Sequence, residues 1–81
     1  MVAMPPTRVT VLQSNGWAYA GASVRLSFVD LLAGGVTQPV LTDAKGVAVI
    51  DHRSKGTADV LVNGHRCGRY VLPDDLTIEV D

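Results

Sequence analysis

The amino-acid sequence predicts an all-β fold, a seven-strand β-sandwich. Three observations support this prediction. Thirteen Val, six Thr and two Ile occur among 81 residues, and β-branched side chains pack well on a sheet but lose entropy in a helix. Lys and Glu, which favour helices, number only two and one. Short runs of β-type residues also recur between turn signals, which is typical of sandwiches and barrels.

The length and charge of the chain limit its organisation and its partners. Eighty-one residues permit one hydrophobic core, so we expect a single domain over 7–81 behind a disordered segment over 1–6, which ends in Pro5-Pro6. The net charge of −1 and the lack of a basic run argue against nucleic acid and anionic membranes as partners. Cys67 is the only cysteine, so no internal disulfide is possible.

The sequence leaves the localisation unknown. It has no apolar stretch near the roughly 20 residues of a membrane-spanning helix, and its first residues lack the pattern of a secretory signal peptide. We therefore expect either an intracellular protein or a mature or excised piece of a larger one.

The first half of the chain contains three predicted strands. Thr7–Gln13 is the first, ending at an Asn-Gly turn, and Ser23–Asp30 is the second, with strict alternation of apolar and polar residues. Leu31–Val36 contains paired glycines and is expected to be a loop, with a helical turn over Leu31–Ala33 as the alternative. Thr37–Thr42 is the third strand, and its proline indicates a sheet edge or a bulge.

The second half contains four predicted strands. Asp43–Gly46 is expected to close a hairpin into Val47–His52, which is apolar on both faces and therefore predicted to be central. After the connection Arg53–Gly56 comes the strand Thr57–Val62. Asn63-Gly64 then predicts a type I′ hairpin turn. The last two strands are His65–Leu72 and Leu76–Asp81, separated by a turn at 73–75.

These strands predict an antiparallel or mixed sandwich, meander-like with at least one crossover between its sheets. The predicted core consists of Val9, Val11, Tyr19, Val24, Leu26, Phe28, Val49, Val60, Val62, Leu76, Ile78 and Val80.

Three segments resemble known β-sandwich modules. Residues 14–26 read SNGWAYAGASVRL, similar to the opening of carboxypeptidase regulatory-like domains, which have the transthyretin-like fold. Residues 42–48 read TDAKGVA, which resembles a hairpin shared by those domains and by bacterial Ig-like domains of the invasin and intimin type; residues 54–60, SKGTADV, resemble the latter group. Ala18 replaces the usual proline and Trp17 a usual polar residue. The resemblance implies a non-catalytic module that spaces or docks other domains, extracytoplasmic or part of a larger protein.

Two aromatic residues are candidates for a ligand or partner surface. Trp17 and Tyr19 are two apart and would share one face of an extended segment, and exposed aromatics can bind sugars or anchor a partner. The alternative places Tyr19 inward as a half-buried cap of the core, because the resemblance aligns it with an apolar position.

Metal and catalytic chemistry receive no support from a motif. His52, His65 and Cys67 could be soft ligands, but a closed zinc site needs four ligands. Asp74 and Asp75 with Asp43 or Asp30 could bind calcium, although such residues are usually solvated turn residues. A nucleophile and base set can be drawn from Cys67, Ser54, His52, His65 and Asp51, yet no local motif fixes its geometry. The C-terminal residues also lack the Tyr-Arg-Gly-Ser ending of the transthyretin-related hydroxyisourate hydrolases.

The resulting expectation is a structural or interaction module without a cofactor, metal or enzymatic activity. Its partner would be a protein or a neighbouring domain, and an exposed strand edge could pair with another chain. Arg66 and Arg69, with Arg53 and Lys55, form a possible basic rim. The alternatives are a carbohydrate- or small-ligand-binding domain that uses Trp17, Tyr19 and the Gly34-Gly35 loop, and a small hydrolase.

Overall fold

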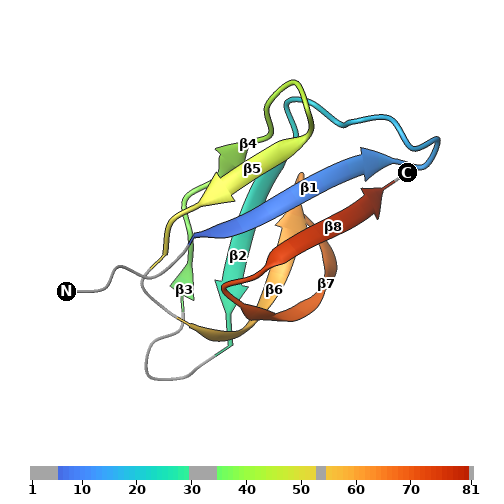
Figure 1. Ribbon diagram of the computed structural model, residues 1–81. Helices are drawn as coiled ribbons and strands as arrows, with labels where there is room; N and C mark the ends of the chain where they lie inside the picture. The colour runs from blue at the N-terminus through green and yellow to red at the C-terminus, as the bar shows by residue number, and fades with distance from the viewer. Residues whose placement is uncertain (1–5, 30–34, 53–54, 81) are drawn as a thin grey trace.

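The computed structural model describes residues 6–29, 35–52 and 55–80 and shows two β-sheets packed against each other (Figure 1). The strands are β1 (Thr7–Gln13), β2 (Ser23–Phe28), β3 (Gly35–Val36), β4 (Val40–Leu41), β5 (Val47–Ile50), β6 (Gly56–Val62), β7 (His65–Leu72) and β8 (Asp75–Val80). The described residues contain no helix. The all-β, sandwich-like prediction is therefore confirmed for this part of the chain.

The smaller sheet has the order β5-β1-β8. β1 is antiparallel to β5 and parallel to β8. The sheet is therefore mixed, which is one of the two forms predicted from sequence. β1 places Val9 and Val11 on its inner face, where both are fully buried. The central strand of this sheet is therefore the first strand of the chain.

The larger sheet has the order β3-β2-β6-β7, and β4 pairs with the same edge of β2 as β3 does. Thr37 lies between these two short strands and continues the edge, because its N–H donates to Leu26 O and its Oγ1 accepts from Leu26 N, both at 2.9 Å. Pro39 follows and has no N–H to donate. Of the two predicted alternatives, the edge position is thus confirmed, although regular pairing in this predicted strand covers only Val40–Leu41.

The chain changes sheet four times, between β1 and β2, β4 and β5, β5 and β6, and β7 and β8. The turn Asp43–Gly46 forms as expected, with Gly46 N donating to Asp43 O at 2.9 Å. Its two flanking strands belong to different sheets, so the turn is a crossover and not a hairpin within one sheet. The Asn63-Gly64 hairpin is confirmed, with φ of 52° and 83°.

Several sequence predictions need correction. β5 ends at Ile50 and lies at an edge of the smaller sheet, where it pairs with β1 alone among the described strands, so the central placement was wrong. Its second face is also open, since Val49 points outward and is 45% exposed. Gly35–Val36 forms a strand on β2 where a loop was expected. The helical-turn alternative at 31–33, most of the proposed disordered segment at 1–5, and residues 53 and 54 of the predicted connection lie outside the described residues.

The core lies between the sheets and is mostly the predicted one. Val49 is wrong, and Tyr19 and Val80 are only partly buried. The prediction missed Ile50 and Leu72, and also the small residues Ala22, Ala48 and Ala58. The buried set is Val9, Val11, Ala22, Val24, Leu26, Phe28, Ala48, Ile50, Ala58, Val60, Val62, Leu72, Leu76 and Ile78.

Candidate functional site

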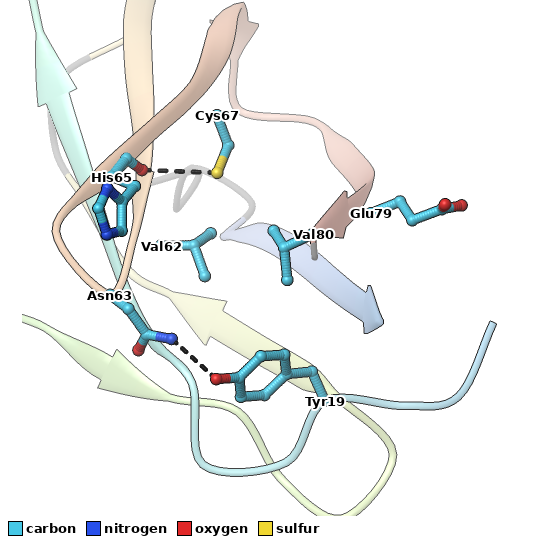
Figure 2. Close-up of a pocket in the computed structure, with 7 residues that line it drawn as sticks. All are labelled: Tyr19, Val62, Asn63, His65, Cys67, Glu79 and Val80. Atoms are coloured by element: carbon cyan, nitrogen blue, oxygen red, sulfur yellow. Dashed lines mark hydrogen bonds between the residues drawn. The ribbon is translucent and has the colours of Figure 1, made fainter. Parts of the chain in front are cut away.

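A pocket of about 320 Å³ opens between the two sheets on the flank formed by β7 and β8. Its lining residues are Tyr19, Val62, Asn63, His65, Cys67, Glu79 and Val80. Figure 2 shows Val62 and Val80 directed toward each other at the centre, with the polar side chains around them. The pocket therefore combines an apolar floor with several hydrogen-bonding groups, the usual composition of a small-ligand site.

The β6–β7 turn organises one side of this pocket. Asn63 adopts a positive φ, which Asn tolerates better than most residues. Its Nδ2 donates to the Tyr19 hydroxyl at 3.2 Å, and its Oδ1 accepts from Ser23 N at 3.0 Å. Tyr19 packs against the core through its ring. The turn, the phenol and the start of β2 are thus tied together at the mouth.

His65 and Cys67 lie on the neighbouring stretch of β7. The Cys67 thiol donates to the backbone oxygen of His65, at 3.5 Å, a weak interaction that does not involve the imidazole. Glu79 projects from β8 on the far side of the pocket (Figure 2). Within the described ranges no group of three or more His, Cys, Asp or Glu side chains is placed to hold a metal ion.

A second candidate surface is the outer face of the larger sheet, which we call the arginine face: Arg25, Asp59, Leu61, Arg66 and Arg69. Arg25, Leu61 and Arg66 lie opposite one another on β2, β6 and β7, and Asp59 lies opposite Arg69. The Nε atoms of Arg66 and Arg69 lie 3.2 and 3.0 Å from Asp59 Oδ1. The hydrogen bond from Arg69, assisted by the charge of Arg66, lowers the pKa of the Asp59 carboxyl.

Exposed aliphatic side chains flank the arginine face. Val36 pairs with Ser27, Leu41 with Ser23 and Val71 with Thr57, and all three of these aliphatic residues are more than half exposed. Since cross-strand partners share a face, these side chains belong to the same outer surface. It therefore offers cations and apolar contacts side by side.

The two aromatic candidates lie in different environments, Trp17 in solvent and Tyr19 against the core. Trp17 is 72% exposed on the turn after β1, where its N–H donates to Asn15 Oδ1 at 3.0 Å. Tyr19 is partly buried against the core, the alternative foreseen from sequence. The two rings do not stack; in the described structure the one ring pair in contact is Phe28 with His52, at 5.1 Å.

The remaining chemical candidates are scattered. Thr7 Oγ1 lies 2.6 Å from His52 Nε2. Cys67 instead lines the pocket on the β7–β8 flank, to which His52 does not contribute, so this histidine and cysteine do not form a pair. The Asp43 carboxylate accepts from the N–H groups of Lys45 and Val47 at 2.8 and 3.0 Å, which makes it a turn residue. Ser54, Arg53, Gly34 and Asp30 lie outside the described residues.

Sequence reasoning missed Asn63, Glu79, Arg25 and Asp59 as site residues. The sequence pattern predicts only a turn position for Asn63 and only the polar side of a strand for Glu79. The Asp59–Arg69 pair follows from the Asn63-Gly64 turn once residues are counted outward along both strands, because charged cross-strand partners interact. The register irregularity between Asp59 and Leu61 places one extra residue in β7, and its sequence signal is Gly68, because a glycine inside a strand often marks a bulge.

Comparisons with known proteins give no family: no protein-family model matches the chain, and no curated protein matches it significantly. The described residues include no helix that is long and apolar enough to cross a membrane.

Proposed function

We propose that this chain is a non-catalytic β-sandwich module of the transthyretin-like or Ig-like kind that docks a protein partner or a neighbouring domain through the arginine face. The observation that carries this proposal is the combination of Arg25, Arg66 and Arg69 with the exposed aliphatic residues around them. Arg is enriched in protein interfaces because its planar group makes both polar and stacking contacts. The resemblance of residues 14–26 and 42–48 to such modules adds support.

The charge of the surface defines the partner. Asp59 neutralises one of the three positive charges, and its two arginines approach it through Nε, which leaves their terminal nitrogens to bind carboxylates. The aliphatic residues Val36, Leu41 and Val71 favour apolar side chains beside those carboxylates. A folded or extended protein segment with Asp or Glu among aliphatic residues has this chemistry, whereas nucleic acid would require a larger positive excess.

The absence of catalysis is part of the proposal. A nucleophile needs a base within hydrogen-bond reach and donors for the developing charge. Cys67 instead contacts a backbone oxygen, and His52 contacts Thr7. These contacts favour a binding role over hydrolysis.

The arginine face can be tested by affinity capture from a lysate of the source cells, followed by crosslinking and mass spectrometry. The bait is the wild-type chain, and the variants are Arg25→Glu and Arg69→Glu. Arg8→Glu is the matched control, because Arg8 is an exposed arginine on the outer face of the other sheet. We expect one partner, crosslinked near Val71 through a segment with acidic residues, to be lost with the first two variants and retained with the control. Equal capture by all baits would contradict the proposal.

The pocket at the β7–β8 flank favours a second candidate function, binding of a small ligand such as a sugar. Its volume of about 320 Å³ is at the lower end of ligand sites, and the Tyr19 hydroxyl, Asn63 amide and His65 ring supply donors and acceptors. An NMR screen with monosaccharides and polar fragments should shift the amides of Asn63 and Cys67. Cys67→Leu, which fills the pocket, should abolish those shifts, and Thr77→Leu on the outer face of β8 should not.

A further inference from the structure

We propose that two copies of this chain form a two-fold dimer in which the β7 edge of each copy pairs with the β8 edge of the other. Within the described residues β7 pairs only with β6, and β8 pairs only with β1. Each strand therefore presents a row of backbone N–H and C=O groups along one side, the feature that lets a sheet add a further strand.

The charges of the two edges select the pairing. The outward side chains of β7 include Arg66 and Arg69, whereas those of β8 are Asp75, Thr77 and Glu79. Like charges directly opposite one another on a sheet are destabilising, and opposite charges are stabilising. Pairing β7 with β7, or β8 with β8, would place like charges together, so only the unlike edges are complementary.

The position of the edges makes the arrangement closed. Both strands border the same pocket, so both edges lie on one flank of the molecule, and Figure 1 shows the chain descending along β7 and returning upward along β8. A two-fold axis parallel to this flank places the larger sheet of one copy beside the smaller sheet of the other copy. Each β7 then lies antiparallel to the partner copy's β8. Two identical ladders then form, which is an isologous interface and stops at the dimer.

The register follows from the side-chain alternation. Inner positions of β7, such as Tyr70 and Leu72, must meet inner positions of β8, such as Leu76 and Ile78, because a slip of one residue would turn apolar side chains outward. In the register that also matches charge, Arg66 lies opposite Glu79. The extra residue that β7 carries between Arg66 and Arg69 then places Arg69 opposite Thr77 and diagonal to Asp75. The interface would close over both edge pockets.

Analytical ultracentrifugation of the whole chain tests the dimer, at concentrations from about 1 µM to about 1 mM, where weak to moderate association is detected. Arg66→Glu and Glu79→Arg should each weaken the dimer by at least about tenfold, since each change alters two symmetric contacts. The double variant restores opposite charges across the interface and should return the dissociation constant to within about threefold of the wild-type value. The matched control is Arg25→Glu. Arg25 is on the same sheet, but its strand β2 is separated from the β7 edge by β6, so this variant should leave the dimer unchanged.

Backbone pairing has a readout of its own. Amide NMR signals of β7 and β8 should shift and gain hydrogen-exchange protection as the dimer forms, while those of β4 and β5 should not. A monomer at every concentration, a dimer indifferent to both charge reversals, or a double variant without recovery would overturn the proposal. This result is separable from partner docking, because Arg25→Glu should abolish capture of the proposed partner alone and Glu79→Arg should disrupt the dimer alone.

Discussion

Thr42 and Ala22 form a reciprocal pair of hydrogen bonds where the chain leaves the larger sheet. Thr42 N donates to Ala22 O, and Ala22 N donates to Thr42 Oγ1, both at 2.9 Å. The Thr42 hydroxyl in turn donates to the backbone oxygen of Tyr19, and both members of the pair are buried. One hydroxyl thus satisfies the buried N–H of Ala22 and the part-buried C=O of Tyr19, and it joins the segment before β2 to the turn before β5.

Replacing Thr42 by Val should destabilise the fold by about 2 kcal/mol, because a buried N–H and a part-buried C=O lose their partner while the side-chain shape is kept. Thr42→Ser keeps the hydroxyl and should cost less. The measurement is the midpoint of urea unfolding, with Thr77→Val on the exposed face of β8 as the control. Equal stabilities of the Val and Ser variants would show that the hydroxyl contributes little.

Gly46→Ala should be more damaging than an ordinary glycine substitution. Gly46 has a φ of 78°, and an added Cβ would lie 2.6 Å from Val11 O, a backbone atom of the central strand. We expect a loss of about 2 to 4 kcal/mol, from strain at positive φ plus this clash. Gly16→Ala is the control, since its φ is 88° but its Cβ would meet no atom within 4 Å. Similar unfolding midpoints for the two variants would contradict the close approach of Gly46 to the backbone of β1.

The inward and outward assignment of β5 can be tested with neighbouring residues. Ile50 is 1% exposed and Val49 is 45% exposed, so Ile50→Ala should cost about 2 to 5 kcal/mol. Val49→Ala should cost about 1 kcal/mol or less, mainly through the lower strand preference of alanine. Calorimetry of the two variants decides the point, and a larger effect at Val49 would mean that the strand is turned the other way.

The ion cluster on the arginine face should make the free energy of unfolding depend on pH in the acidic range. The pKa of Asp59 is lowered from its ordinary value of 3.8, first by the Arg69 hydrogen bond and then by the Arg66 charge. A carboxyl with a lowered folded-state pKa contributes stability above its unfolded pKa and loses it as the pH falls through the folded value. The difference in unfolding free energy between wild type and Asp59→Asn should therefore be constant near neutral pH and shrink below about pH 4.

Urea unfolding over a pH series measures this difference, and Asp43 requires its own control. The pKa of the Asp43 carboxyl is also lowered, by hydrogen bonds from the N–H groups of Val47 and Lys45. Repeating the comparison in the Asp43→Asn background removes that contribution. Parallel acid curves for wild type and Asp59→Asn would rule out the Asp59 cluster as a source of the dependence.

The strand positions followed well from local pattern. Alternation in 23–28 and the turn chemistry of Asn63-Gly64 depend on neighbouring residues, and the bounds of β1 and β7 agree with the predicted ones. The pattern of Val47–His52 led to the wrong prediction of a central strand, because the side chains of Val47 and Val49 are apolar but point outward. A run that is apolar on both faces indicates a buried strand only when another layer covers the second face, and no layer covers β5 among the described residues.

The candidate site was harder to predict because its geometry is made by the pairing of distant segments. Tyr19 and Asn63 are 44 positions apart and meet only after β2 pairs with β6. The parallel pairing of β1 with β8 leaves no local mark, since parallel partners are never joined by a tight turn. The sequence places Arg66 and Arg69 in a basic rim, but finding their partner Asp59 requires the hairpin register.

The neighbours of β1 also determine when this molecule can fold. Its hydrogen-bonding partners come from residues 47–50 and 75–80, so β1 leaves the ribosome before either of its neighbours. Contacts between such remote segments slow folding to roughly the millisecond-to-second range. Until β8 emerges, the smaller sheet is incomplete, and the burial of Val9 and Val11 that it provides is not yet in place.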